Sequence, residues 1–265
     1  MKSFTLWIIS FLITIGSAYY QRITGPTYAV KGEKKLDGIT TKYKLERSHS
    51  TSSNYLIGIM VKNDSIGGFV EWKRYKTKDK FSKIVMSNKN GILSAELPAQ
   101  PAAGKLIYNV YLDYKDHTTP LSNQPVIIRF KGDVPIGILI PHIILIFLAM
   151  LLSTRTGLEI FAVNHQLKKY TTWTIIFLIL GGMILGPLTQ LYAFGELWTG
   201  IPFGWDLTDN KTLIAFTGWI IAAIMIRKSN KPKSWIIFAS VLTLVIFLIP
   251  HSVLGSELNY SKMNN

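Results

Sequence analysis

Hydrophobic residues gather into five blocks along the chain, separated by more polar stretches. Each block is near the roughly 20 residues that a helix needs to cross a hydrocarbon core of about 30 Å. The blocks lie within Met1 to Tyr20, Pro135 to Ser153, Trp173 to Tyr192, Thr212 to Ile226 and Trp235 to Ile249. They predict a membrane α-helical bundle of about five transmembrane helices, including the N-terminal one. Mixed apolar and basic residues from Phe161 to Tyr170 predict a further helix on the inner membrane surface.

The N-terminal block has features of both a cleaved signal peptide and a retained membrane anchor. Lys2 precedes the apolar run Leu6 to Ile15, and the small residues Gly16 to Ala18 follow it, as in a cleavable signal peptide. Trp7 and the two tyrosines at the end of the block are residues that sit at membrane interfaces, as in a retained anchor. We favour the anchor.

Gln21 to Asp133 alternates apolar and polar residues and contains no long apolar run, which is typical of β-strands. The expected strands are Tyr55 to Lys62, Gly68 to Lys76, Phe81 to Met86, Ile92 to Leu97, Leu106 to Tyr114 and Pro125 to Phe130. The Asn90-Gly91 turn predicts a hairpin that pairs the third of these with the fourth. About seven short strands in roughly a hundred residues is typical of an immunoglobulin-like or fibronectin-like sandwich. We therefore expect an inserted all-β domain of this kind.

Charge predicts the orientation in the membrane. The formal net charge is +14, and nineteen of the 29 Lys and Arg residues lie between Arg22 and Lys131. The connections Thr154 to Thr172 and Arg227 to Lys233 carry basic residues, whereas Tyr192 to Asn210 carries only acidic ones. Because basic loops stay in the cytoplasm, the β-domain and the C-terminus are expected outside it. We expect a multi-pass protein of the plasma (inner) membrane of a bacterium.

Three parts follow: residues 1–20 as anchor or signal segment, residues 21–133 as extracytoplasmic sandwich, and residues 134–265 as a four-helix transmembrane domain. The last part includes an aromatic outer loop, residues 192–211.

The chain has no cysteine, which excludes disulfides, thiolate metal sites and covalent c-type haem attachment. Acidic residues interspersed among the basic ones, and the lack of a nucleic-acid module, argue against nucleic acid as a partner. No nucleophile, zinc or phosphate-loop motif is present, so we assign no catalytic residues and do not expect an enzyme.

The outer loop is unusually rich in aromatic residues. Trp198, Phe203 and Trp205 precede Asp206. One interpretation is a belt of aromatic side chains at the level of the lipid headgroups, with an acidic residue that caps the next helix. A second is a calcium site formed by Asp206, Asp209 and Asn210, although a complete ligand loop is missing.

A third interpretation comes from a resemblance. The run of Trp198, Gly200, Phe203, Trp205 and Asp206, followed by Asp209, Thr212 and Trp219, resembles the tryptophan-rich outer loop of the haem-handling proteins of cytochrome c maturation. Leu207 and Thr208 depart from that pattern. The resemblance implies an aromatic surface for haem, made by Trp198, Phe203, Trp205 and Asp206. It also implies flanking histidines as axial ligands, here His142 and His251.

His142 is notable without the resemblance. It lies among Ile140, Ile143 and Ile144 in the second block, where an imidazole is costly unless it faces protein, water or a metal. A hydrogen bond to a neighbouring helix is the alternative to ligation. Two further patterns are structural: Gly181, Gly182 and Gly186 permit close helix approach, and Arg155 and Glu159 have the spacing of an ordinary ion pair.

Three functions remain open. The first is binding or handling of haem or a related redox cofactor at the outer face, in cytochrome maturation or a respiratory complex. The second is a non-catalytic assembly or interaction subunit whose sandwich docks an extracytoplasmic or membrane protein partner, while the helices contact lipids. The third is a component of a small transporter or channel, for which inverted repeats and charged residues in mid-span are missing.

Overall fold

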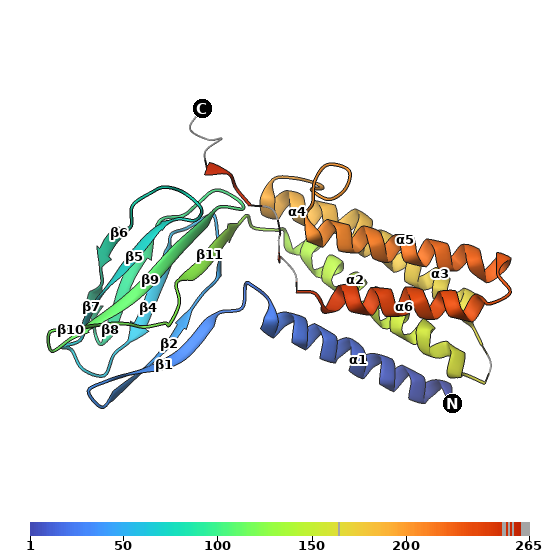
Figure 1. The fold of residues 1–265 in the computed structure, drawn as a ribbon, viewed down its shortest axis with the longest axis horizontal. Helices are drawn as coiled ribbons and strands as arrows, with labels where there is room; N and C mark the ends of the chain where they lie inside the picture. Colours follow the sequence, from blue (N-terminus) through green and yellow to red (C-terminus); the bar gives the residue numbers. More distant parts are fainter. Residues whose placement is uncertain (164, 251–252, 254, 256, 261–265) are drawn as a thin grey trace. The chain divides into compact units, whose positions relative to one another are not determined.

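The computed structural model describes residues 1–163, 165–250, 253, 255 and 257–260 (Figure 1). The chain divides into two compact units. Met1–Pro26 and Val134–Ser256 form the first, which we call the helical unit, and Thr27–Asp133 and Glu257–Asn265 form the second, the β unit.

The helical unit contains six α-helical segments. They are α1 (Ser3–Thr24), α2 (Ile136–Leu158), α3 (Leu167–Phe177), α4 (Gly186–Phe194), α5 (Leu207–Lys228) and α6 (Pro232–Leu248). A 3₁₀ turn, η1 (Glu159–Phe161), extends α2, and a π-helical stretch, η2 (Leu178–Leu185), joins α3 to α4. Four helices in the described residues are long and apolar enough to cross a membrane: Ser3–Thr24, Ile136–Phe161, Leu167–Phe194 and Leu207–Lys228. The fifth, α6, is apolar but has 17 residues, at the lower end of the spanning range.

The predicted interfacial helix is wrong. Phe161 ends the 3₁₀ turn after α2, and Leu167–Tyr170 forms the first turn of α3. Lys168 and Lys169 are thus the exposed end of a long helix. Long basic side chains at such an end lay their stems along apolar surface, which produces the same mixed pattern as a surface helix.

Small residues bring the helices together as expected. A Cβ atom at Gly181 would lie 2.9 Å from the Cβ of Leu145, and one at Gly182 would lie 2.7 Å from Cγ2 of Thr212. Neither position therefore has room for a side chain, and η2 packs closely against both α2 and α5. Trp219 of α5 is fully buried and donates its Nε1–H to Oγ1 of Thr243 in α6, at 2.9 Å.

At the C-terminal end of α2, Arg155 and Glu159 form the expected ion pair, but both side chains are buried. Aromatic rings cover the Arg155 guanidinium, whose carbon lies 5.4 Å from the ring centre of Trp7 and 4.9 Å from that of Tyr170. Arg155 also donates to Oγ of Ser3 at 3.1 Å. A buried charge that loses its partners strongly destabilises the folded state. The contacts that Ser3 and Trp7 of α1 make with Arg155 therefore matter to the stability of the helical unit.

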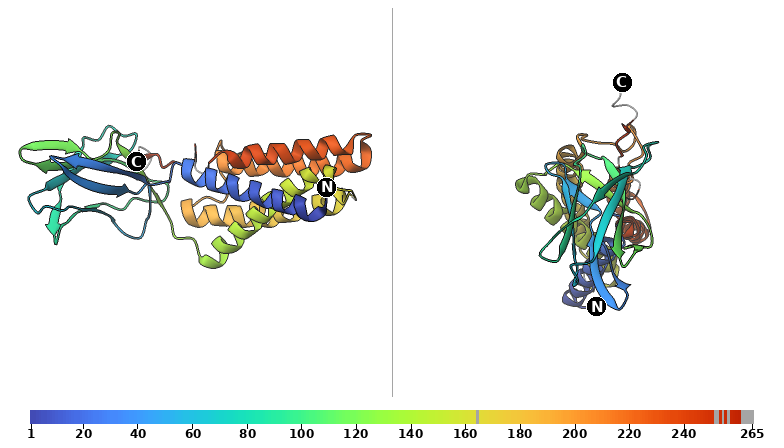
Figure 2. Two further views of the ribbon diagram at one scale, coloured as in Figure 1. Left: turned by 90° about the horizontal axis from the view of Figure 1, so that it is seen from below. Right: turned by 90° about the vertical axis from the view of Figure 1, so that its left-hand side faces the viewer.

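Helix α1 lies alongside α2 and α6 (Figures 1 and 2). Leu6 and Ser10 are fully buried. Near its end, Gln21 donates through Nε2 to the carbonyl of Phe247 at 2.7 Å. Both ends of α1 are therefore integrated into the helical unit, as for a retained anchor.

We predict that the mature protein keeps α1. Cleavage after the small residues near Ala18 would remove Ser3, Trp7 and Leu6 and expose the buried charges of Arg155 and Glu159, which would destabilise the helical unit. Mass spectrometry of the protein purified from its membrane should give a mass that includes Ser3–Thr24. A mature N-terminus near Tyr19 or Tyr20 would contradict this prediction.

The β unit contains eleven strands within the described residues, in three hydrogen-bonded groups (Figure 1). The first group is a two-stranded sheet that pairs β1 (Val30–Leu36) with β2 (Ile39–Leu45). The largest sheet has the order β3 (Ser48–Ser50), β11 (Val126–Lys131), β9 (Lys105–Tyr114), β5 (Gly67–Arg74) and β6 (Ser82–Val85), and β10 (His117–Pro120) also pairs with β9. The third sheet has the order β4 (Tyr55–Met60), β8 (Ile92–Leu97) and β7 (Ser87–Lys89). All pairs are antiparallel except that of β3 with β11.

One hydrophobic core joins these sheets. Every second residue of β4 is buried, beginning at Tyr55, and β9 alternates in the same way through Leu106, Tyr108, Val110 and Leu112. The alternation expected from the sequence is therefore the pattern that builds the core.

The Asn90-Gly91 turn is confirmed, but its predicted hairpin is wrong in one partner. Both residues have positive φ, 54° and 75°, as a two-residue hairpin turn requires. The turn joins β8 to the short β7, whereas the preceding β6 pairs with β5 in the other sheet. The chain thus changes sheets within Phe81 to Lys89, a switch that continuous alternation does not reveal. The polar strands β1, β2, β3, β7 and β10 were not predicted.

Candidate functional site at the loop between α4 and α5

The aromatic loop, residues 195–206 in the structure, connects α4 to α5. Helix α4 ends at Phe194 and is capped by Gly195, whose φ of 84° suits glycine. Helix α5 begins at Leu207, ahead of the apolar block that starts at Thr212, and Asp206 caps it by accepting a hydrogen bond from the backbone N–H of Thr208 at 2.8 Å. The predicted acidic cap is confirmed, and Asp206 is the residue that provides it.

Asp209, in the first turn of α5, fixes the loop. Its Oδ2 accepts hydrogen bonds from the backbone N–H groups of Thr199 at 2.6 Å and Gly200 at 3.1 Å. The same oxygen accepts from Nε2 of Gln190, in α4, at 3.0 Å. The next residue, Asn210, accepts from the backbone N–H of Ile201 at 2.8 Å. With Asp209 only 5% exposed, one carboxylate joins α4, the loop and α5.

Gly200 is required by this geometry. A Cβ atom there would lie 2.7 Å from the Cβ of Asp209 and 2.8 Å from Oδ1 of Asn210. Any other residue would push the loop away from the acceptors that hold its backbone. Asp206, Asp209 and Asn210, which suggested a calcium site, instead accept hydrogen bonds from backbone N–H groups of the chain. Among the described residues no group of three or more His, Asp or Glu side chains could hold a metal ion.

The three aromatic candidates differ in their surroundings. Trp198 is half-buried and donates its Nε1–H to the carbonyl of Ile201 at 3.1 Å. Phe203 and Trp205 are 81% and 84% exposed. Leu197 and Ile201 of the same loop are also exposed. We refer to Leu197, Ile201, Phe203 and Trp205 as the aromatic patch.

His142 has the partner that its alternative interpretation required. Its Nδ1 lies 2.9 Å from the carbonyl oxygen of Gly181, in the π-helical stretch η2. A carbonyl can only accept, so Nδ1 carries the proton and donates. A π-helical segment inside an α-helix is frequent at functional sites. In the described residues no hydrogen bond or ring contact joins His142 to Trp198, Phe203 or Trp205. The other candidate ligand, His251, lies outside the described residues.

Gln190 and Lys211 were not identified as site residues from the sequence. Gln190 donates to Asp209, and Lys211, which is buried, donates through Nζ to the carbonyl of Ile249 at 2.7 Å, beyond the last turn of α6. The sequence signal for Lys211 was the polar cluster Asp209-Asn210-Lys211, which directly precedes the apolar block that starts at Thr212.

No protein-family model matches the chain, and no curated protein matches it either.

We predict that Asp209→Ala releases the loop. The substitution removes the acceptor of the Thr199 and Gly200 N–H groups and one of the two acceptors of the Gln190 amide. This loss should cost about 1–3 kcal/mol of unfolding free energy. Hydrogen exchange of residues 196–206 should become faster. Asp209→Asn retains one acceptor oxygen and should have a smaller effect. Equal exchange in the wild type and the Ala variant would show that Asp209 does not hold the loop.

Proposed function

We propose that this chain is a multi-pass protein of a bacterial plasma (inner) membrane that acts as a non-catalytic interaction or assembly subunit. In this proposal the helical unit spans the bilayer and the β unit, an immunoglobulin-like or fibronectin-like sandwich, docks a partner outside the cytoplasm. The lengths and composition of the helices support membrane insertion. The antiparallel sheets around a single core support the sandwich.

The observation that carries the proposed interaction role is the aromatic patch, which lies in the helical unit on a loop held by Asp209. Large exposed apolar side chains favour contact with a protein partner or the membrane interface. Because hydrogen bonds to Asp209 already order the loop backbone, binding costs little further conformational entropy. Phe203 and Trp205 can then contribute large apolar area at a low entropic cost.

The patch should be needed for complex formation. We predict that Phe203→Ser together with Trp205→Ser converts a larger complex, seen for the wild type on native gels after mild detergent extraction, to the free chain. The variant should keep its thermal stability, since both side chains are exposed. Val163→Ser is a matched control, because Val163 is 82% exposed in another loop of the helical unit. Migration of the wild type as the free chain, or an unchanged complex in the double variant, would contradict the proposal.

Haem handling is the second candidate, because the hydrogen bond that gives His142 its partner uses only Nδ1. Histidines that bind metals usually donate their other ring N–H to a carbonyl or carboxylate. The Nδ1–H of His142 does so to Gly181, and Nε2 is left with its lone pair for an axial bond. Haem bound there would supply redox chemistry, while Trp198, Phe203 and Trp205 would provide aromatic surface.

If this second candidate is correct, protein supplemented with haem should show a Soret band. His142→Asn should remove or shift the band although its amide can still donate to Gly181, because Asn has no counterpart of Nε2. Trp205→Phe should weaken binding less, and Asp206→Ala should act through the loop by removing the cap. Spectra and thermal stability measured on the same samples separate ligation from misfolding. A colourless wild type, or a band indifferent to His142→Asn, would exclude His142 as a ligand.

A further inference from the structure

The segment Glu257–Tyr260, which follows the helical unit in the chain, belongs to the β unit and lies on its surface. Its backbone joins the β unit through the N–H of Leu258, which donates to the carbonyl of Ala103 at 3.2 Å. The side chains of Glu257 and Tyr260 make ion pairs, hydrogen bonds and a ring contact with other residues of the β unit. None of the four residues belongs to the hydrophobic core that joins the sheets.

Glu257 lies between two lysines. One carboxylate oxygen is 2.6 Å from Nζ of Lys76, and the other is 2.9 Å from Nζ of Lys105. The Glu257 and Lys105 side chains are only 29% and 20% exposed, so the pair is partly shielded from solvent. Charge-assisted hydrogen bonds of this length are stronger than neutral ones.

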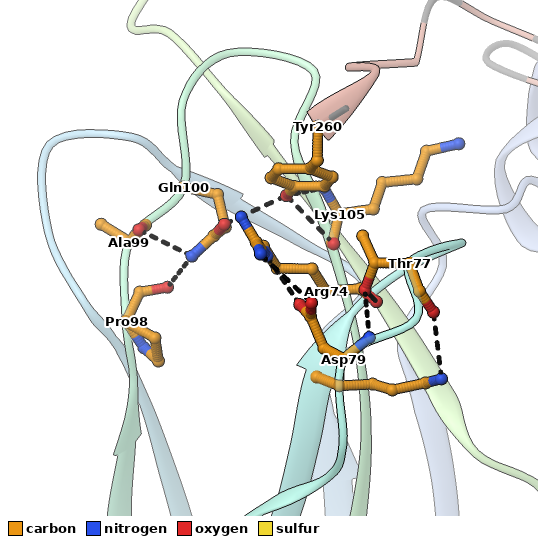
Figure 3. A network of polar contacts seen from close by, with 9 residues as sticks. Arg74, Thr77, Asp79, Pro98, Ala99, Gln100, Lys105 and Tyr260 are labelled. Atoms are coloured by element: carbon orange, nitrogen blue, oxygen red, sulfur yellow. Dashed lines mark hydrogen bonds and ion pairs between the residues drawn. The ribbon is translucent and has the colours of Figure 1, made fainter. Parts of the chain in front are cut away.

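Tyr260 fills a notch beside the start of β9 (Figure 3). Its hydroxyl oxygen accepts from the backbone N–H of Lys105 at 3.0 Å and lies 3.0 Å from Oε1 of Gln100, to which it donates. Gly104 forms the notch, since a Cβ atom there would lie 2.9 Å from the hydroxyl. Tyr260 is buried, and a phenylalanine would leave the Lys105 N–H without its acceptor.

Arg74 covers the ring of Tyr260. The guanidinium carbon lies 5.2 Å from the ring centre, within the range of a cation–π contact. Asp79 orients Arg74 by accepting from Nε at 2.6 Å and from Nη2 at 3.1 Å (Figure 3). Arg74, Lys76 and Lys105 are thus presented to an acidic and aromatic ligand. A cavity of about 660 Å³ between residues 74–79 and the segment shows that the segment does not close the surface completely.

We propose that the β unit carries a peptide-binding site specific for a glutamate followed three residues later by a tyrosine, and that Glu257–Tyr260 of this chain is the ligand that occupies it. Each ligand group has its own receptor: two lysines for the carboxylate, and a backbone N–H, a glutamine and an arginine for the tyrosine. The β unit has its core without the segment, so the segment can leave without unfolding it. Covalent attachment gives the segment a high effective concentration, which keeps the site filled in the intact chain.

The test uses a variant that ends after Ser256 and a fluorescent peptide with the sequence Val253–Asn265. The truncated protein, purified in the same detergent as the full chain, should bind the peptide. The full chain should bind at least about tenfold more weakly, because its own segment competes at high effective concentration. Circular dichroism and thermal melting of the truncated protein verify that it is folded.

Peptide and protein variants test the specificity. Glu257→Gln and Tyr260→Phe in the peptide should each weaken binding, and a peptide of the same composition with a different Glu-to-Tyr spacing should not bind. In the protein, Lys105→Gln should weaken binding, whereas Lys89→Gln makes the same charge change on the exposed strand β7 and should not. A folded truncated protein that does not bind, or that binds the respaced peptide equally, would overturn the proposal.

If truncation prevents folding, the full chain with Glu257→Gln and Tyr260→Ala provides the same test. Release of the segment should expose the backbone N–H of Lys105, which donates to Tyr260 in the wild type. Hydrogen exchange at Lys105 should therefore become faster in the double variant, while exchange in the middle of β9 stays unchanged. Unchanged protection at Lys105 would also overturn the proposal.

Acidic pH should weaken binding of the peptide through its Glu257 carboxylate. Burial alone would raise the pKa of Glu257, but hydrogen bonds from Lys76 and Lys105 outweigh it and lower the pKa. Nearby, the hydrogen bond from Arg74 lowers the pKa of Asp79, which therefore stays charged. Peptide affinity should be constant above the ordinary Glu pKa of about 4.3 and should fall as the pH drops through the lower pKa of the bound state. The Glu257→Gln peptide should lack this dependence, and an identical pH profile for both peptides would argue against the carboxylate contacts.

Discussion

A polar side chain enclosed by apolar helices has to find its hydrogen-bond partner within the protein, because an apolar environment offers none. In the helical unit this constraint determines which segments are neighbours. Arg155 pairs with Glu159, and Trp7 of α1 and Tyr170 of α3 cover its guanidinium. His142 joins α2 to η2 through Gly181. Apolar packing alone tolerates many helix arrangements, whereas each of these pairs is satisfied in one.

The same constraint explains why the loop between α4 and α5 is ordered. Asp209 could not remain buried at the start of α5 without donors, and the N–H groups of Thr199 and Gly200 provide them. The loop in turn holds Phe203 and Trp205 in exposed positions. A buried carboxylate therefore holds the backbone of the loop that presents the two exposed rings.

The β unit rests on a different kind of interaction. Its sheets share an apolar core, and the segment Glu257–Tyr260 adds to their surface through ion pairs, one cation–π contact and hydrogen bonds. Surface ion pairs are individually weak and sensitive to salt. The core stabilises the sheets without any residue of the segment. The segment is held by weaker surface contacts, as its proposed release from the binding site requires.

The sequence by itself determined what depends on local pattern. Apolar blocks indicated the helices, alternation indicated β4 and β9, the Asn90-Gly91 pair indicated its turn, and an acidic residue before α5 indicated the cap. These features are readable because side-chain periodicity and turn conformation depend on neighbours in the chain. The tertiary structure alone decided the burial of Arg155, the partner of His142 and the docking of Glu257. His142 and Gly181 are 39 residues apart, and Lys105 and Glu257 are 152 apart, so no local pattern relates them. Such contacts exist only when the packing of whole segments brings the two partners to hydrogen-bonding distance.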